Sequence, residues 1–436
     1  MSIQKKNQQH ILQKLGIEKL NPMQENAKLA IHSNAEIVLV SPTGTGKTLA
    51  FLLPIIQNLA DDIPEVQALI LVPSRELAIQ IEQVTREMGA GYKANAVYGG
   101  RTVSKDKSNL SHRPAILIGT PGRVADHLRK ETFSTEFIKT LVLDEFDKSL
   151  EVGFEEEMSE IIETLPAITK KVLTSATHEI EIPDFVGLTN PTYLTYTDTG
   201  EAELTIKTVV SPSKDKLQTL VDLLQHLGEK QGVVFCNFKE SIQRVSDFLI
   251  DHDIQHGCFY GGLEQYDREK ALIKFRNGTH RLLLATDLAA RGIDVPELEF
   301  IVHYHLPLKG QEFTHRNGRT ARMNNGGIAY VLKWEGENLP DFIEGAELEE
   351  LTSAPSPAAT QWQTLFLSGG RKDKISKGDI AGFFFKQGKL EREQLGSIEL
   401  KQDCAFVAVH SAKVDQVIAQ TDQTRLKKKK IRVQLV

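Results

Sequence analysis

Two short stretches contain residues whose types and spacing could do chemistry: SPTGTGKT (41–48) and DEFD (144–147). Gly44 and Gly46 would let backbone N–H groups wrap a phosphate where a helix begins. The second stretch sets three carboxylates close together after the apolar run LVL, and such groups repel one another. By itself it could cap a helix, face water, or hold a metal with its catalytic water.

Taken together, the two stretches favour a nucleotide site. Lys47 would reach the β- and γ-phosphates of a nucleotide, and the Thr48 hydroxyl would bind Mg²⁺. Asp144 would hold the same Mg²⁺, and Glu145 would orient or deprotonate the attacking water. The cation offsets the repulsion between the carboxylates, so helix capping becomes the weaker interpretation. The expected phosphate-binding segment is Ser41, Pro42, Thr43, Gly44, Thr45, Gly46, Lys47 and Thr48, with Ser41 replacing the usual leading glycine.

Composition excludes several classes of protein. The 436 residues suggest about three domains. The N-terminus lacks the apolar stretch of a signal peptide, and no apolar run approaches the roughly 18 residues of a membrane span, so no membrane partner is expected. Cys236, Cys258 and Cys404 lie far apart without a CxxC pair, which favours a reducing, cytoplasmic location over disulfides or structural zinc.

Short apolar runs alternate with helical stretches along most of the chain. Continuous apolar strands separated by amphipathic helices predict parallel sheets covered on both faces, in two doubly wound α/β domains. The only plausible boundary between these domains is the polar stretch 195–205, and a linker is expected near 335–361. The predicted strands are 37–40, 68–72, 115–118, 141–143 and 171–174, then 232–235, 281–285, 300–304 and 328–332.

Most polar motifs follow one of these strands, and their order along the chain resembles that of the DEAD-box RNA helicases. The resemblance covers residues 15–332. Besides the two stretches above, it rests on GIEKLNPMQ (16–24), PSRELA (73–78), GG (99–100), TPGR (120–123), SAT (175–177), VVFCN (233–237), TDLAARGID (286–294) and HRNGRTAR (315–322).

The resemblance implies two RecA-like domains in tandem and a role for each motif. Gln24 would read the adenine edge, while Gly292 and Asp294 would line the ATP cleft. Arg319 and Arg322 would come from the second domain to the γ-phosphate, so hydrolysis would require the domains to close. The implied RNA contacts are Pro73, Arg75, Gly99, Gly100, Thr120, Pro121, Gly122, Arg123, Thr286 and Asp287. The implied coupling residues are Asp147, Ser175, Thr177 and His315. Singly, most of these positions also fit a helix cap, a turn or a strand-end hydrogen bond.

The sequence departs from the family pattern at a few positions. Phe146 replaces the alanine of the DEAD motif, which leaves its carboxylates in place. No aromatic residue precedes the 16–24 motif, which puts adenine stacking in doubt. Asn317 and Ala321 vary within the last motif without touching its arginines. None of these changes predicts an inactive enzyme.

The last 74 residues, 363–436, have a different charge. They hold 15 Lys/Arg against 8 Asp/Glu, a net charge of +7, whereas the whole chain is −6 and residues 1–362 therefore −13. A basic tail on an acidic body suits nucleic acid, although a solvated lysine-rich surface would look the same.

The predicted order of elements in the tail is strand, helix, strand pair, helix, strand, which favours a small RRM-like α+β domain. Phe366 and Phe406 would stack bases, unless both belong to the core. The tail resembles the RNA-binding domain of DbpA-type helicases, which implies recognition of a ribosomal RNA hairpin. The basic residues expected to contact RNA there are Arg371, Lys372 and Lys374.

The sequence as a whole predicts two RecA-like α/β domains (1–197 and 203–338), a linker (339–361) and an RRM-like domain (362–436). The predicted protein is a monomeric, cytoplasmic, ATP- and Mg²⁺-dependent RNA helicase that remodels large-subunit ribosomal RNA, with pre-ribosomal particles as partners. Two alternatives remain open. An ATP-gated RNA clamp would bind without separating strands, and a DNA helicase is disfavoured by the motif set.

Overall fold

The computed structural model describes residues 7–42, 44–100, 106, 110–176, 181–196, 204–287, 295, 298–318, 320, 327–352, 354–355 and 358–436. The chain divides near residues 202–203 into two compact units, and the tail belongs to the second of them. No helix within the described ranges has both the length and the apolar character needed to cross a membrane.

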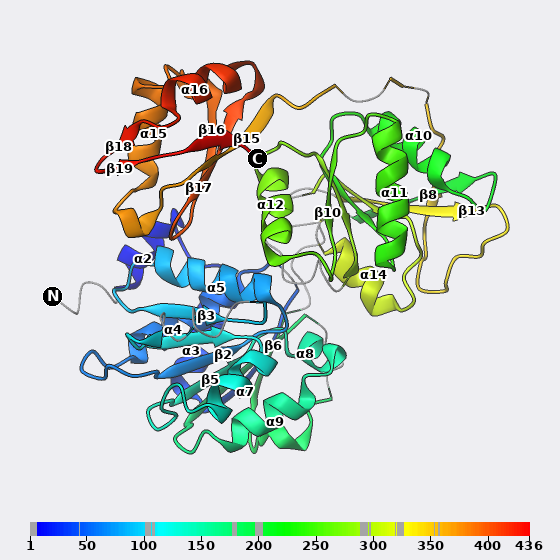
Figure 1. Cartoon of the computed structure of the whole chain (residues 1–436). Coiled ribbons are helices and arrows are strands. Elements are labelled where there is room, and N and C mark those ends of the chain that lie inside the picture. Colours follow the sequence, from blue (N-terminus) through cyan, green and yellow to red (C-terminus); the bar gives the residue numbers. More distant parts are fainter. Residues whose placement is uncertain are drawn as a thin grey trace. The chain divides into compact units, whose positions relative to one another are not determined.

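The first unit is built on a seven-stranded, fully parallel sheet in the order β3-β4-β2-β5-β6-β1-β7 (Figure 1). Its inner strands are almost continuously apolar because both faces of the sheet are covered. The strands are β1 (Glu36–Val40), β2 (Ala68–Leu71), β3 (Ala94–Val97), β4 (Ile116–Gly119), β5 (Thr140–Leu143), β6 (Lys170–Ser175) and β7 (Thr192–Thr195).

Helices cover the two faces of this sheet. Strand residues such as Ile37 and Ile70 pack with α2, α3, α4 and α5, whereas their neighbours Val38 and Leu71 pack with α7, α8 and α9. This alternation is the period-2 pattern of a strand, and it makes the unit doubly wound. The helices are α2 (Gln8–Leu15), α3 (Pro22–Ser33), α4 (Lys47–Asn58), α5 (Arg75–Glu87), α7 (Pro121–Arg129), α8 (Phe146–Val152) and α9 (Glu155–Glu163), with a 3₁₀ turn at Asp184–Val186.

The second unit repeats this architecture with a parallel sheet in the order β10-β11-β9-β12-β13-β8-β14 (Figure 1). Helices α10 and α11 pack on one face, while α14 and residues 339–346 pack on the other. Its elements are β8 (Leu204–Ser211), α10 (Leu217–Leu227), β9 (Gly232–Phe235), α11 (Lys239–Asp251), β10 (His256–Phe259), α12 (Gln265–Arg276), β11 (Leu282–Ala285), β12 (Phe300–His303), α14 (Gly310–Asn317), β13 (Gly327–Trp334) and β14 (Glu347–Leu348).

The tail forms a four-stranded antiparallel sheet in the order β16-β17-β15-β20. Its core lies between one face of this sheet and the helices α15 and α16 (Figure 1). Its elements are β15 (Trp362–Leu367), α15 (Lys377–Lys386), β16 (Leu395–Leu400), β17 (Ala405–His410), α16 (Val414–Thr421) and β20 (Val433–Leu435), with a small hairpin of β18 (Arg425–Leu426) and β19 (Lys429–Lys430). The predicted fold class, two parallel α/β domains followed by a small α+β domain, is confirmed.

Part of the expected linker is ordered structure. Glu347 and Leu348 form β14, which pairs with Lys207 and Thr208 of β8 at the edge of the second sheet. Just beyond this strand, Glu349 forms an ion pair with Lys207 at 2.6 Å. Residues 347–349 therefore extend the second parallel domain.

Candidate active site and RNA-binding surface

The phosphate loop lies between β1 and α4, as predicted. Gly44 and Gly46 have φ of +83° and +86°, a left-handed conformation that favours glycine and turns the chain into the helix. Helix α4 begins at Lys47, whose Nζ donates to the carbonyl oxygens of Ser41 and Pro42, the latter at 2.9 Å. The ammonium is therefore held against the loop that would cradle a phosphate.

The 16–24 motif packs directly on this loop. Asn21 and Gln24 form a capping box at the start of α3. The same two side chains reach the loop backbone, because Gln24 Nε2 donates to Gly46 O at 3.2 Å and Asn21 Nδ2 donates to Thr45 O at 3.0 Å. A side chain at Gly46 would collide with the Gln24 amide, so both this contact and the positive φ favour glycine at this position.

The acidic residues follow β5, and a hydroxyl from the neighbouring strand joins them. Thr174, fully buried in β6, donates from Oγ1 to Asp144 Oδ1 and accepts from the backbone N–H of Glu145 at 3.1 Å. Glu145 has φ +48°, an uncommon conformation for a non-glycine residue and one that occurs at functional sites. Asp147 is buried, and its carboxylate lies 3.5 Å from Lys148 Nζ.

The charge balance at Asp144 fits a divalent cation. Burial, followed by the neighbouring Glu145 carboxylate, raises the pKa of Asp144 to about 6, although Thr174 and Lys47 act in the opposite direction. A cation would relieve this unfavourable negative charge. Among the described residues, no group of three or more His, Cys, Asp or Glu could hold a metal by itself. Asp144 and Thr48 would therefore share Mg²⁺ with the phosphates of a nucleotide.

Strand order divides the carboxyl edge of the first sheet into two halves. The nucleotide motifs follow β5, β6 and β1, which are consecutive in the sheet. The motifs expected at RNA follow β3, β4 and β2, the other three consecutive strands. Because ligands of open α/β sheets bind beyond the carboxyl ends of the strands, one edge can serve both ligands side by side.

The RNA half brings several of the predicted residues together. The guanidinium of Arg75, the first residue of α5, packs over the Gly99–Gly100 turn, where a Cβ on Gly100 would lie 2.7 Å from Nη1. Thr120 is the residue just before α7, without a side-chain capping hydrogen bond, and the helix begins at Pro121 and continues through Gly122. Pro73 is buried just before Ser74, whose side chain caps α5.

Arg123 has an acidic partner that the sequence did not reveal. Its Nε and Nη2 lie 2.9 and 2.7 Å from one oxygen of Asp106, a fully buried carboxylate. The fully buried His127 contacts the same oxygen at 3.4 Å. Burial would raise the pKa of Asp106, but His127 and Arg123 outweigh it and keep that pKa lowered.

In the second unit, a buried arginine joins three loops at the carboxyl edge of the sheet. Arg316, 1% exposed, binds both carboxylate oxygens of Asp287, with Nε at 2.6 Å from Oδ1. It also donates to Asn237 Oδ1 at 2.8 Å and to His305 O at 2.9 Å. These partners follow β11, β9 and β12, so Arg316 fixes the three loops relative to one another.

Breaking this network should destabilise the second unit. Arg316→Ala is expected to lower its free energy of unfolding by about 3 kcal/mol, the low end for a broken buried pair because Asp287 stays 22% exposed. Arg244→Ala, which removes the exposed pair with Asp215, should cost about 0–1 kcal/mol. Both tryptophans, Trp334 and Trp362, lie in the second unit, so urea unfolding followed by their fluorescence measures it selectively. Equal costs for the two variants would contradict the assigned role of Arg316.

Comparison with known proteins agrees with this geometry. Residues 21–185 match the family described as DEAD/DEAH box helicase, residues 215–324 match the Helicase conserved C-terminal domain, and residues 364–435 match the DbpA RNA binding domain. The ATP-dependent RNA helicase DbpA of Escherichia coli (strain K12) is 33% identical over 439 residues, covering 98% of this chain and 96% of its own. The protein of the same name from Bacillus subtilis (strain 168) is 31% identical and covers 97% of this chain.

The chain belongs to the DEAD-box helicase family. It is an RNA helicase and ATPase of the DbpA type, as its motifs predicted. Solved structures agree on the fold. Dbp5 of S. cerevisiae bound to RNA and ADP BeF3 has a TM-score of 0.66 and 27% identity, over 74% of this chain and 86% of that one. Mss116 bound to ssRNA and UDP-BeF has a TM-score of 0.68 and 25% identity, over 79% of this chain and 77% of that one.

Two departures from the DEAD-box pattern have structural explanations. Phe146, the first residue of α8, is 1% exposed and packs in the apolar cluster that also holds Leu141 and Leu143. Asn317 accepts a hydrogen bond on Oδ1 from the buried His303 Nε2 at 3.0 Å. Burial, and after it the nearby Arg316 guanidinium, lowers the pKa of His303 to about 3. The ring is therefore neutral, and its Nε2–H is the donor of this hydrogen bond to Asn317.

The remaining predicted site residues of this helicase fall into two groups: some are described by the structure and others lie outside the described residues. Thr286 and His315 are described and half-buried. Arg316 binds both carboxylate oxygens of Asp287, which positions the loop after β11, and the RNA contact expected of Asp287 stays a prediction. The residues outside the described ranges are Thr43, Thr177, Gly292, Asp294, Arg319 and Arg322.

In the tail, two basic segments that lie about fifty residues apart in sequence meet in space. Lys427 Nζ donates to Lys374 O at 2.6 Å and forms an ion pair with Asp379 at 2.6 Å. Lys429 forms an ion pair with Asp373, also at 2.6 Å. We call this surface the basic cluster; its members are Arg371, Lys372, Lys374, Lys427, Lys428, Lys429 and Lys430.

The two phenylalanines expected to stack bases are not part of the basic cluster. Phe366 and Phe406 are directly opposite each other on β15 and β17, with ring centroids 5.6 Å apart. They lie on the sheet face away from α15 and α16, because the alternate residues of both strands form the core. Phe366 is half-buried, but Phe406 is only 3% exposed and offers no open face to a base in this structure.

Proposed function

We propose that this protein couples ATP hydrolysis to local unwinding or remodelling of large-subunit ribosomal RNA during ribosome assembly. The carboxyl edge of the first sheet supports this proposal, because it juxtaposes a nucleotide half with an RNA half. The tail matches the DbpA RNA binding domain, and family resemblance links that domain to a ribosomal RNA hairpin. A monomer acting in the cytoplasm on pre-ribosomal particles is part of the proposal, and the free state of its three cysteines suits that compartment.

The residues of the first unit have distinct tasks in this reaction. The loop around Gly44 and Gly46, with Lys47, binds the β- and γ-phosphates of ATP. Mg²⁺, when bound, neutralises charge on those phosphates. Glu145 orients the attacking water and takes its proton. Thr174 holds both acidic residues in register with β6, so we assign it a positioning role.

RNA should control the rate of hydrolysis. ATPase activity is expected to be low without RNA and to rise when RNA is added, because RNA bound by both domains favours the closed state that delivers Arg319 and Arg322. Arg322→Ala should lower the stimulated rate by about 10³-fold or more, the effect of removing an arginine finger. The measurement is steady-state phosphate release with and without saturating single-stranded RNA.

The nucleotide affinity of a first-domain fragment ending near residue 197 supplies the control for Arg322→Ala, because that fragment lacks both arginines. Its affinity should match that of the full-length variant without RNA. If the full chain hydrolyses ATP as fast alone as with saturating RNA, the closure model is wrong.

The basic cluster is our proposed site for structured RNA in the tail. Its two segments hold seven Lys and Arg residues and meet at Lys374 and Lys427, while Asp379 and Asp373 pair with only Lys427 and Lys429. Phosphates are the groups that such an excess of positive charge recognises. Crosslinking the protein to RNA in cells and sequencing the bound fragments tests the ribosomal target. Enrichment of one large-subunit hairpin supports the proposal, and reads spread evenly over all RNA would refute it.

The RNA clamp remains the alternative function, and strand displacement distinguishes the two. A helicase should separate a short RNA duplex in the presence of ATP, whereas a clamp should bind the duplex without separating it. Glu145 after β5 favours turnover, because a pure clamp has no need of a water-orienting carboxylate.

A further inference from the structure

The carboxyl edge of the second sheet carries two exposed aromatic rings. Phe238 lies in the loop after β9 and is 61% exposed, while Tyr266 lies in the first turn of α12, after β10, and is 57% exposed. Of the Phe, Tyr and Trp residues that the structure describes in the second unit, these two are the most exposed. A single exposed ring needs no explanation, but two at one edge of a sheet indicate a binding surface.

The two rings flank the loop that begins with Thr286 and Asp287. In the sheet order β10-β11-β9, the strand before this loop lies between the strands that precede the two rings. The Thr286 N–H donates to Phe259 O at the end of β10 at 3.3 Å, and Arg316 connects Asp287 with Asn237 after β9. Since adjacent strands lie about 4.8 Å apart, the loops after β10 and β9 start roughly 10 Å apart. An RNA strand that contacts Thr286 and Asp287 therefore passes within reach of both rings.

Phe238 occupies a position where local stability favours another type of residue. It is the N-cap of α11, at which Ser, Thr, Asn or Asp would accept a hydrogen bond from the first turn, and the phenyl ring makes no such bond. An edge-on contact with His305, 6.3 Å between ring centroids, holds the ring while most of its surface stays open. An exposed ring in place of a helix cap brings no gain for the fold, as is expected at functional positions.

Tyr266 is accompanied by a positive charge. The Lys270 ammonium lies 5.2 Å from the centre of the Tyr266 ring, one helical turn further along α12. It is placed to meet the phosphates of a strand whose base covers the ring. Aromatic rings beside cations are the pattern by which proteins bind single-stranded nucleic acid.

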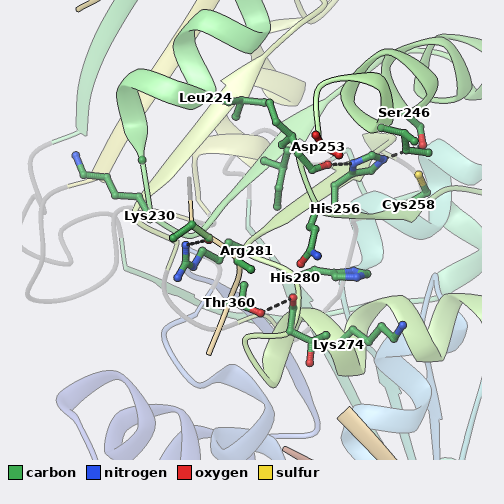
Figure 2. A pocket seen from close by; sticks show the side chains of 18 of the residues that line it. Leu224, Lys230, Ser246, Asp253, His256, Cys258, Lys274, His280, Arg281 and Thr360 are labelled. Atoms are coloured by element: carbon green, nitrogen blue, oxygen red, sulfur yellow. Dashed lines mark hydrogen bonds between the residues drawn. The ribbon is translucent and has the colours of Figure 1, made fainter. Parts of the chain in front are cut away.

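The amino edge of the same sheet lacks this pattern. Figure 2 shows a cavity of about 760 Å³ at that edge, lined by residues that include His256, Cys258 and His280. Of the described residues that line this cavity, Phe300 is the only Phe, Tyr or Trp, and it is 2% exposed. The exposed rings of this sheet thus lie at the carboxyl edge, where α/β sheets bind their ligands.

We propose that Phe238 and Tyr266 form a platform on which unpaired RNA bases stack, next to the predicted contacts at Thr286 and Asp287. The ligand class is single-stranded RNA, because bases inside a duplex already stack on one another and leave no free face for a ring. The platform holds one strand after it has separated from its complement. This inference rests on RNA binding at the carboxyl edge of the second sheet and is independent of the ribosomal target.

The test measures the affinity of the full chain, with a non-hydrolysable ATP analogue, for two RNA decamers. One is a run of adenosines, and the other has the same sugars and phosphates but no bases. Phe238→Thr and Tyr266→Gln should each weaken binding of the adenosine decamer at least about fivefold, the lower end for one lost stacked base. Binding of the base-free decamer should stay unchanged. Phe238→Trp should keep the parental affinity for adenosines, because the indole ring also stacks.

Both ring variants should fold, because Thr is a preferred N-cap residue and Gln suits an exposed helical position. Tyr193→Thr removes a 60% exposed ring from β7 of the first unit, and this matched control should bind both decamers as the parent does. Unchanged adenosine affinity in either ring variant would overturn the platform. An equal loss of affinity for the base-free decamer would overturn it too, since the rings would then contact the backbone.

One further variant tests the premise separately. Thr286→Val removes the hydroxyl of a predicted backbone contact and should weaken binding of both decamers to the same extent. If it weakens neither, RNA does not lie along this edge, and the platform fails with its premise. If it weakens both while the ring variants match the parent, the edge binds RNA and the platform alone is wrong.

Discussion

Glu145→Gln is expected to leave ATP bound and to slow its hydrolysis about 10²–10⁴-fold, the usual contribution of a general base. The amide keeps the size of the carboxylate and the helical start at Phe146, but it can no longer take a proton from water. Lys47→Ala should act differently, because it removes the ammonium that the loop holds for the phosphates. That variant should weaken ATP binding itself.

The two effects are separated by measuring nucleotide affinity and single-turnover hydrolysis in each variant. Glu155→Gln, in the exposed first turn of α9, is the matched control and should match the parent in both. ATP turnover by Glu145→Gln at the parental rate would remove Glu145 from its assigned role. Unaltered affinity in Lys47→Ala would do the same for the lysine.

Deleting residues 358–436 is expected to abolish the preference for hairpin RNA over random RNA while ATPase chemistry continues. The tail is the basic part of an otherwise acidic chain, and binding strengthens with each phosphate that it neutralises. The salt dependence of RNA affinity should therefore become shallower, by a slope of about 0.7–0.9 for each phosphate that the tail no longer neutralises. Competition binding at two or more salt concentrations measures both effects.

The deletion also uncovers the turn between α12 and β11, where Asn277 and Thr279 hydrogen-bond with Thr364 of the tail. These groups are polar and water can satisfy them, so the second domain should stay folded. The paired change Lys372→Glu with Lys374→Glu keeps the tail docked and reverses part of the basic cluster. It should remove most of the same preference. If neither change affects the preference, specificity lies in the helicase domains and the tail is a solvated basic surface.

Strands with continuous apolar sequences were predictable, and strands of mixed composition, several of them at sheet edges, were not. The runs at 37–40 and 232–235 are buried on both faces, and their composition alone predicts a strand. By contrast β3 (ANAV), β7 (TYLT) and β10 (HGCF) are short, and polar or small residues interrupt their apolar character. Each is the first or last strand of its sheet, where less of the strand needs to be apolar.

In the candidate site, too, only some of the important residues could be predicted from the sequence. The motifs identified the residues that follow each strand, because those residues are contiguous in sequence. The partners of these residues were missed: Thr174 for Asp144, Asp106 for Arg123 and Arg316 for Asp287. Each partner comes from another part of the chain, and only the strand order brings it close. Thr174 was within reach of inference, since it directly precedes the SAT motif at the end of a predicted strand.

The tail illustrates why an aromatic pair is an ambiguous pattern. Phe366 and Phe406 alternate with core residues, as expected for the outer face of a sheet. Sequence cannot show whether such a face meets RNA or another domain, since both partners favour aromatic residues. The order of the last elements was nonetheless correct, because period and turn positions depend only on local sequence.

The position of Phe146 has a consequence for how such proteins are recognised. In the D-E-x-D pattern, the first two residues meet at Thr174, whereas the third points into the apolar core of the first domain. That third letter is therefore constrained by available volume and not by the chemistry of ATP. A search for the exact sequence Asp-Glu-Ala-Asp therefore overlooks any member whose core accommodates a larger side chain, such as the Phe146 ring, at the third position. The lasting signature of the family is a pair of adjacent carboxylates at the end of a buried strand, whatever residue fills the space behind them.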